Sequence, residues 1–223
     1  MGYCGERCLA TSDGPDKVAV TIRCCSWSCA DCQEQRKRQL ICKAMDGEPN
    51  RLITLTSRRT PNVTPELAAR ALVRAWRLVR RNIKHQRPGE EVHFLAIFEQ
   101  TKLGWPHLHV LVRSRFIDQA WLSAEMARLT DSPIVDVRAI RNKRGAAKYV
   151  SKYIAKAPGK FGTLKRYWTS QRYAVVPYVK KKATWPWDAQ PFNLTKWIEA
   201  WRTFGWTVTL ETATKARARP PPR

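Results

Sequence analysis

Two strand-like segments on either side of a short turn constrain the fold more than any other feature of this sequence. Residues 92–100 (VHFLAIFEQ) are rich in aliphatic and aromatic side chains, and residues 107–113 (HLHVLVR) resume that pattern. Gly104, Trp105 and Pro106 between them are typical of a tight connection. The sequence therefore predicts an antiparallel pair of strands.

The segments around this pair predict further strands and helices. Strands are expected at residues 51–57 and 133–140, and helices at residues 64–84, 118–129, 143–156 and 193–204. The first helix has Thr64 and Pro65 at its start, a favourable N-cap followed by a first-turn proline. Its buried side is expected to hold Leu67, Ala71, Val73, Leu78 and Val79. This order indicates an α+β fold, in which helices pack against an antiparallel sheet.

Composition divides the chain into four parts. Residues 1–45 are rich in cysteine and basic side chains and are expected to form a zinc-binding module. Residues 46–160 carry the strand and helix patterns and are expected to form the catalytic core. Residues 161–212 are aromatic and basic, which we interpret as a C-terminal extension of that core, and residues 213–223 are expected to be a disordered basic tail.

The charge balance points to a polyanionic partner. The 223 residues include 41 Lys and Arg against 18 Asp and Glu, a formal net charge of +23. Nucleic acid is the first candidate for such a chain, and an anionic membrane surface is the second. No segment has the pattern of a signal peptide or of a membrane span. We therefore expect a cytoplasmic protein without a membrane partner.

Two of the four histidines lie one residue apart on a predicted strand. Side chains of a strand alternate between its faces, so His107 and His109 should point the same way while Leu108 points into the core. Glu99, near the end of the preceding strand, is expected to approach them across the hairpin. Two imidazoles and a carboxylate suit Mn²⁺, and Mg²⁺ when phosphate supplies further oxygen ligands. The alternatives are a solvated polar face and a salt bridge from Glu99 to an arginine.

The segment KYVSKYIAK predicts a helix with tyrosines and lysines on one face. Tyr149, Lys152, Tyr153 and Lys156 are spaced at i, i+3, i+4 and i+7. A phenol is a weak nucleophile, and a metal that polarises a phosphodiester together with a nearby ammonium would make its attack possible. The alternative is an ordinary helix with two aromatic core residues and two solvated lysines.

Six of the seven cysteines lie in the first 32 residues, which favours thiolates on a metal over a disulfide framework. Cys4, Cys8, Cys29 and Cys32 have a spacing close to that of a four-thiolate Zn²⁺ site. A set built from Cys24, Cys29 and Cys32 is also plausible. The module is expected to present Arg36, Lys37 and Arg38 to phosphates, and Lys156 is a further candidate contact to nucleic acid.

Taken in order, these motifs resemble the HUH superfamily of rolling-circle replication initiators, in its two-tyrosine phage and plasmid form. LITLTS at 52–57 is similar to the first motif, HLH at 107–109 to the second, and YVSKYIAK to the third. The resemblance spans residues 50–157, about half of the chain. It implies a ferredoxin-like antiparallel sheet and nicking and rejoining of single-stranded origin DNA through a 5′-phosphotyrosine.

The resemblance also implies roles and partners. Tyr149 corresponds to the first nucleophile, Tyr153 to the second, and Lys152 to the lysine that assists the tyrosine, while Glu99 corresponds to the acidic metal ligand. A GxxxxGK[ST] loop is absent, so a host helicase and polymerase are the expected partners in a bacterial cytoplasm. Two other functions stay open: an HUH transposase or relaxase, and a zinc-containing nucleic-acid-binding protein without catalysis.

Overall fold

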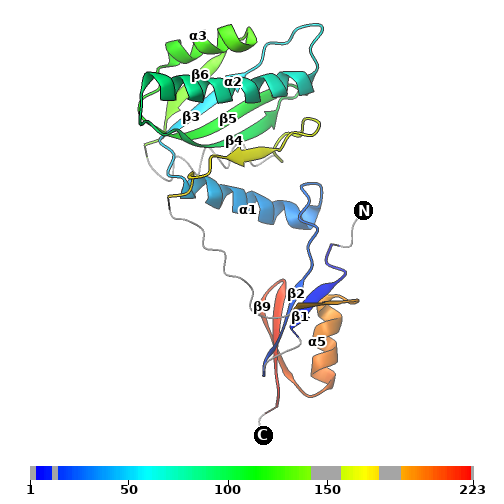
Figure 1. The fold of residues 1–223 in the computed structure, drawn as a ribbon. Coiled ribbons are helices and arrows are strands. Elements are labelled where there is room, and N and C mark those ends of the chain that lie inside the picture. The colour runs from blue at the N-terminus through cyan, green and yellow to red at the C-terminus, as the bar shows by residue number, and fades with distance from the viewer. Residues whose placement is uncertain (1–3, 12–14, 142–156, 176–186, 222–223) are drawn as a thin grey trace. The chain divides into compact units, whose positions relative to one another are not determined.

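The chain divides into two compact units, each of which is described by itself. The structure is a computed structural model and describes residues 4–11, 15–141, 157–175 and 187–221 (Figure 1). Lys37–Tyr178 form one unit, here called the central unit. Met1–Arg36 and Val179–Arg223 together form the other, here called the terminal unit. The division differs from the predicted boundaries, because both ends of the chain contribute to one unit.

The central unit contains a five-stranded antiparallel sheet in the order β6-β3-β5-β4-β7. Its strands are β3 (Arg51–Thr56), β4 (His93–Gln100), β5 (Pro106–Arg113), β6 (Val135–Ala139) and β7 (Tyr167–Thr169). The predicted hairpin is confirmed as the β4–β5 pair. With the helices, the sheet gives a mixed α+β fold, as the sequence predicts.

Two helices pack on one face of this sheet, α2 (Pro65–Gln86) and α3 (Gln119–Thr130) (Figure 1). Thr64 caps α2 by accepting a hydrogen bond from the Leu67 amide at 3.2 Å, and Asp118 caps α3 by accepting from the Trp121 amide at 2.7 Å. Side chains of β3, β4 and β5 alternate between this apolar face and the opposite one. The opposite face is therefore the one that carries the histidines.

The buried side of α2 differs from the prediction. Leu67 is 54% exposed, whereas the buried residues are Ala68, Ala69, Leu72, Ala75, Trp76, Val79 and Ile83. These positions recur every three or four residues, as a helix face requires. Of the five residues expected on this side, only Val79 is fully buried.

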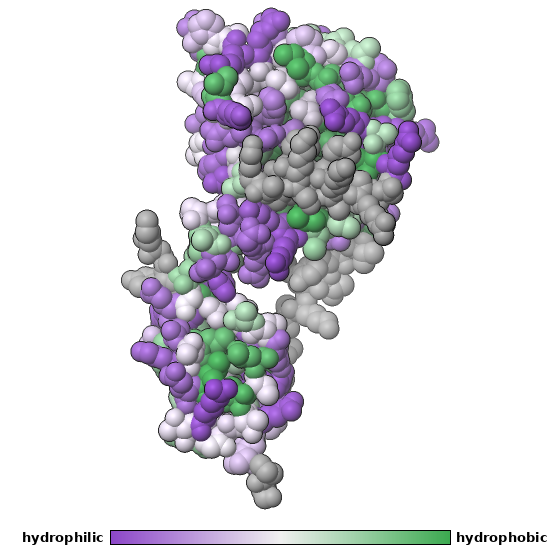
Figure 2. Space-filling model, turned by 180° about the vertical axis from the view of Figure 1, so that it is seen from behind, coloured by the Kyte–Doolittle hydropathy of each residue, from purple (hydrophilic) through white to green (hydrophobic). Residues whose placement is uncertain are grey.

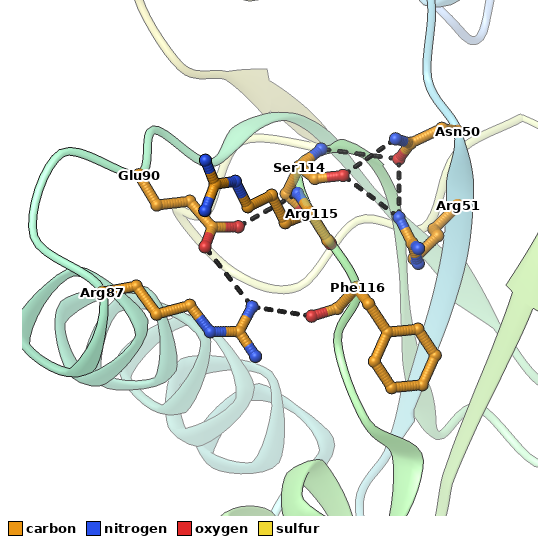
Figure 3. Close-up of polar contacts among 7 residues, drawn as sticks. All are labelled: Asn50, Arg51, Arg87, Glu90, Ser114, Arg115 and Phe116. Atoms are coloured by element: carbon orange, nitrogen blue, oxygen red, sulfur yellow. Dashed lines mark hydrogen bonds and ion pairs between the residues drawn. The ribbon is translucent and has the colours of Figure 1, made fainter.

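A group of polar contacts ties the C-terminal end of α2 to the segment between β5 and α3 (Figure 3). The Arg87 guanidinium donates to the Phe116 carbonyl at 2.7 Å and to Glu90 at 3.3 Å. Glu90 also accepts a hydrogen bond from the Arg115 amide at 3.0 Å, and the Glu90 side chain is only 5% exposed. Asn50, just before β3, contacts the same segment by donating to the Ser114 carbonyl at 2.8 Å.

Glu90→Ala is expected to destabilise the protein by about 1–3 kcal/mol, because it leaves the Arg115 amide and part of the Arg87 guanidinium without their acceptor. Glu66→Ala is the control, since Glu66 pairs with Arg70 at an exposed position where an ion pair contributes less than about 1 kcal/mol. Thermal unfolding followed by circular dichroism measures both. Equal losses in the two variants would contradict the assigned role of Glu90.

The end of α1 (Ala30–Asp46) packs tightly against a loop of the central unit. Tyr173 is 2% exposed and its hydroxyl donates to the Ala44 carbonyl at 2.8 Å. Its ring lies against Gly47, where a Cβ atom would come within 2.1 Å of the ring carbon Cζ. Burial raises the pKa of the Tyr173 phenol, which therefore acts as a neutral hydrogen-bond donor.

The terminal unit is a second antiparallel sheet in the order β8-β1-β2-β10-β9, with one helix on it. Its elements are β1 (Cys8–Thr11), β2 (Lys17–Thr21), β8 (Trp187–Gln190), α5 (Leu194–Thr203), β9 (Thr207–Thr212) and β10 (Lys215–Arg219). Small side chains of the sheet pack against Leu194 and Trp197 of α5. The predicted helix at residues 193–204 is confirmed, with Asn193 as its N-cap.

The expectation of a disordered tail is wrong for Lys215–Arg219, which form β10 between β2 and β9. Ala216 and Ala218 are fully buried, while the basic residues between them alternate to the other face. Likewise, residues 161–212 are not one extension of the core, because β7 joins the central sheet whereas β8, α5 and β9 join the terminal one. None of the helices in the described part of the chain combines the length and apolar composition needed to cross a membrane.

Candidate metal centres

The pairing of β4 with β5 brings three metal-ligating side chains to one face of the central sheet. Glu99 lies directly opposite His107, and His109 is two residues further along β5. Residues opposite each other and two apart share a face, so all three point away from α2 and α3. The predicted group of Glu99, His107 and His109 is therefore brought together by the structure, with one ligand atom of each within 4.8 Å of the others.

His109 is held at both ring nitrogens. Its Nε2 lies 2.6 Å from Glu99 Oε2, and its Nδ1 lies 3.1 Å from Thr54 Oγ1 on β3. The Nδ1 contact fixes the ring plane and leaves Nε2 as the atom that would meet a metal beside the carboxylate. Thr54 was not among the predicted site residues. The sequence does carry a signal for Thr54. It lies between Ile53 and Leu55 in LITLTS, so strand alternation turns it to the face away from these two buried residues.

The environment of His107 favours a neutral imidazole. His109 is 4% exposed, and His107 is half-buried beside it. Burial lowers the pKa of His107, and the neighbouring His109 lowers it further, against an opposing effect of Glu99. Neutral imidazole is the form that binds a metal ion, so His107 is ready to bind near neutral pH.

Aromatic and basic side chains border this group at the hairpin turn. Gly104 has φ of 78° and closes the turn, and the Trp105 amide donates to Thr101 Oγ1 at 2.9 Å. The guanidinium carbon of Arg59, which follows β3, lies 5.6 Å from the centre of the Trp105 ring. Leu103 at the tip is 70% exposed. The hairpin turn therefore carries a cation over an aromatic ring and an exposed apolar tip.

The chain returns to the Glu99 end of β4 at Gly159. The Gly159 amide donates to the Phe98 carbonyl at 2.7 Å, and a Cβ atom on Gly159 would lie 3.2 Å from the Glu99 carbonyl carbon. Only a residue without a side chain permits this approach. The predicted catalytic residues Tyr149, Lys152 and Tyr153, and the predicted contact Lys156, lie outside the described residues.

A second group of possible ligands lies in the terminal unit. Its members are Cys4, Cys24, Cys29 and Cys32, whose sulfur atoms all lie within 4.8 Å of one another. Cys4 Sγ and Cys24 Sγ lie 3.4 and 3.7 Å from Cys32 Sγ. A backbone hydrogen bond from Cys24 and the Cys32 thiol lower the pKa of Cys4 to about 7, whereas burial raises the pKa of Cys32 to about 12.

The cysteine group corrects the predicted zinc ligands in one position. Cys8 is fully buried at the start of β1, among the apolar side chains that α5 covers, and burial raises the pKa of its thiol. Cys24 takes the place predicted for Cys8. The short spacing within the pairs Cys4–Cys8 and Cys29–Cys32 had suggested Cys8 as a ligand. A strand begins at Cys8, however, and its side chain points into the core of the sheet.

The three basic residues predicted to contact phosphates lie on α1. Arg36 donates to the Cys25 carbonyl at 2.7 Å, and its guanidinium carbon lies 5.0 Å from the centre of the Trp27 ring. Arg36 thus supports the loop that carries Cys24 and Cys25. Arg38 is exposed and Lys37 is partly exposed, and contact of these residues with nucleic acid stays a prediction.

Comparison with known proteins was informative for the central unit alone. No curated protein and no solved structure matched the chain. Residues 50–158, just under half of the chain, match the family described as replication-associated protein ORF2/G2P. The matched span includes β3, β4, β5 and β6, and with them Thr54, Glu99, His107 and His109. This span of the chain is therefore similar to replication-associated proteins.

Proposed function

We propose that the protein is an HUH endonuclease of the two-tyrosine type. It would nick and rejoin single-stranded DNA at a rolling-circle origin through a 5′-phosphotyrosine. The observation that carries the proposal is the group of Glu99, His107 and His109 on adjacent strands, within a span similar to replication-associated proteins. A replication-associated protein that carries two imidazoles and a carboxylate on one sheet face has the ligands for a metal-assisted phosphodiester reaction.

The strand order supports an HUH fold. In chain order the described elements β3, α2, β4, β5, α3 and β6 give a strand–helix–strand–strand–helix–strand sequence. The corresponding strands lie as β6-β3-β5-β4, so the first and third strands are central. A ferredoxin-like sheet has the same order of strands, which supports the proposed fold. The histidines would then lie on a central strand, with the helices on the far face.

The side chains of the site fit Mg²⁺ or Mn²⁺. Two imidazoles and one carboxylate leave open positions for water and phosphate oxygen. When bound, the metal would polarise the scissile phosphodiester and stabilise charge on its oxygens. Thr54 orients His109, and Glu99 supplies the negative charge that a divalent cation requires.

The covalent step is assigned to Tyr149, with Lys152 stabilising the phenolate as its proton leaves. The phenolate oxygen forms a bond to phosphorus while the bond from phosphorus to the 3′ oxygen breaks. The 3′ oxygen takes up a proton and becomes a free hydroxyl, and the 5′ phosphate stays on the protein. Tyr153 would attack a second phosphodiester in the same way, and the 3′ hydroxyl freed there would attack the Tyr149 phosphoester, which rejoins the strand and releases the Tyr149 phenol. Gly159, six residues after Tyr153, contacts the backbone at Glu99, and six residues span at most about 20 Å.

Single-stranded origin DNA is the proposed substrate, with a host helicase and polymerase as further partners. The formal net charge of +23 favours binding to phosphates. The face seen in Figure 2 is mostly hydrophilic over the described residues of the central unit. Near the metal ligands, Arg59 lies over Trp105 and the exposed Lys102 lies at the turn. These cations would hold the phosphates that flank the scissile one.

Tyr149→Phe is expected to reduce covalent capture of DNA by about a thousandfold or more, since the nucleophilic oxygen is removed. The substrate is a pool of single-stranded oligonucleotides with a randomised centre and a 3′ fluorophore, incubated with Mn²⁺. Wild-type protein should acquire a fluorescent adduct that resists denaturant, because the fragment with the 5′ phosphate carries the label. Sequencing of the captured fragments would also give the recognised site.

Tyr167→Phe is the matched control. Tyr167 on β7 pairs with Ile97 and therefore lies on the same sheet face as Glu99, so it is the described phenol best placed to act instead. An undiminished adduct in both Tyr149→Phe and Tyr153→Phe would overturn the assignment. Loss of the adduct in Tyr167→Phe alone would move the nucleophile to β7.

A further inference from the structure

We propose that Cys4, Cys24, Cys29 and Cys32 bind one structural Zn²⁺, and that this ion is required for the terminal unit to fold. Three separate segments supply the ligands. Cys4 precedes β1, Cys24 lies in the loop after β2, and Cys29 and Cys32 lie at the start of α1. An ion held by all four would join segments that the backbone leaves apart.

The distances agree with tetrahedral coordination by sulfur. A Zn–S bond of about 2.3 Å in a tetrahedron separates neighbouring sulfurs by about 3.8 Å. The structure places Cys24 Sγ 3.7 Å and Cys4 Sγ 3.4 Å from Cys32 Sγ, and all four sulfurs fall within 4.8 Å. These separations are far longer than a disulfide bond of about 2.0 Å, and all four cysteines are free. Four protein ligands leave no open position, which is typical of a structural site.

The neighbouring cysteines show why the set is selective. Cys25 adjoins Cys24 but adopts φ of 50° and is exposed, and it is absent from the group. Cys8 is buried in the apolar cluster under α5. Cys42 is exposed near the far end of α1. These three thiols are internal controls for any measurement on the four ligands.

The start of α1 suits a group of thiolates. The Gln33 amide donates to the Cys29 carbonyl at 2.9 Å, so the helix begins at the ligand pair and directs its N-terminal dipole at the sulfurs. Arg23, one residue before Cys24, adds positive charge within this loop, and its guanidinium lies 4.0 Å from Asp31. The helix dipole and the charge of Arg23 both reduce the electrostatic repulsion among the four thiolates in the absence of the metal ion.

In the described part of the terminal unit, Arg36 contacts the loop at the Cys25 carbonyl and the buried Trp27, but the buried cluster of the sheet does not reach it. Among the described residues, its buried cluster consists of alanines and Cys8 in the sheet with Leu194 and Trp197 of α5. That cluster lies on the α5 face of β1, β2 and β10 and does not include the loop from Arg23 to Cys29. When a site forms only in the folded chain, its metal-binding free energy contributes to folding. Loss of zinc should therefore unfold the terminal unit before the central one.

The test measures zinc in a full-length protein that carries His107→Ala and His109→Ala, so that the other candidate centre cannot contribute. We expect one zinc per chain by elemental analysis after dialysis. X-ray absorption at the zinc edge should show four sulfur neighbours at about 2.3 Å and no nitrogen or oxygen. In the same background Cys24→Ser should lose the zinc, whereas Cys25→Ser and Cys8→Ser should keep it.

Three results would overturn the proposal: less than half a zinc per chain, nitrogen or oxygen in the first shell, or equal zinc loss in Cys25→Ser and Cys24→Ser. The absorption measurement needs no cysteine variant, so unfolding of Cys24→Ser does not compromise it. A zinc chelator should also remove one step of thermal unfolding in the histidine variant and leave the step of the central unit. None of these readouts depends on nicking, so the proposed endonuclease can fail while the zinc site stands.

Discussion

His109→Ala is expected to lower nicking of single-stranded DNA by about a thousandfold, a loss of about 4 kcal/mol of transition-state stabilisation. His109 is 4% exposed, and its Nε2 lies 2.6 Å from Glu99 Oε2. Removing the ring leaves only Glu99 and His107 for the metal. The measurement is the rate of cleavage of a labelled oligonucleotide in Mn²⁺, with salt-dependent DNA binding measured alongside.

His85→Ala and Thr54→Val are the controls for that loss. His85 is exposed in the last turn of α2, so its removal should leave nicking unchanged. Thr54→Val keeps the metal ligands but removes the 3.1 Å contact at Nδ1, and should weaken metal affinity about ten- to a hundredfold. Higher Mn²⁺ should restore Thr54→Val but not His109→Ala. Unchanged nicking by His109→Ala would refute the metal centre, and equal loss of DNA binding would indicate a structural role.

Gly47→Ala is expected to destabilise the central unit by about 3 kcal/mol or more, because the new Cβ would lie 2.1–2.4 Å from three ring carbons of Tyr173. Neither partner can move easily. Tyr173 is 2% exposed and donates to the Ala44 carbonyl, and the Gly47 carbonyl accepts from Arg113 at 2.7 Å. The melting temperature of the central unit should fall by roughly 6–12 °C.

A double variant tests whether the clash with Tyr173 is the cause. Tyr173→Leu removes the ring, so Gly47→Ala should cost much less in its presence than in the wild type. Gly89→Ala controls for backbone effects, since Gly89 has φ of 85° but open space around it and should lose about 1 kcal/mol. Additive effects of Gly47→Ala and Tyr173→Leu would show that the ring contact is not responsible.

Local patterns predicted the hairpin of the central sheet and the placement of Glu99, His107 and His109 on one face. The alternation in HLHVLVR places His107 and His109 on one face. The turn at Gly104 then brings Glu99, on the neighbouring strand, next to His107 on that same face. The alternation in LITLTS puts Thr54 on the face away from Ile53 and Leu55, but its contact with His109 depends on the pairing of β3 with β5, which no local pattern specifies. The expected face of α2 was wrong because Leu67, Ala71 and Leu78 lie beside the buried stripe, which recurs every three or four residues through Leu72, Trp76 and Ile83.

The terminal unit was predicted poorly because its contacts join distant parts of the chain. Cys8 pairs with Thr21 and with Gln190, so neither the spacing of the cysteines nor the local composition shows that its side chain is buried. In β10 (KARAR) buried and basic residues alternate. Because the buried residues are alanines and not large apolar side chains, the sequence does not look like a strand. Ion pairs from Arg217 to Glu211 and Asp16 then stabilise a segment whose composition is typical of disorder.

The placement of β10 between β2 and β9 sets an order of events during synthesis on the ribosome. The terminal sheet cannot be completed until Lys215–Arg219 have left the exit tunnel, although β1 and β2 are among the first strands made. The central unit, which needs no residue beyond Tyr178, is free to fold while they wait. Until then β2 keeps an unpaired edge, so newly made chains are exposed to strand-mediated aggregation in the interval before β10 emerges.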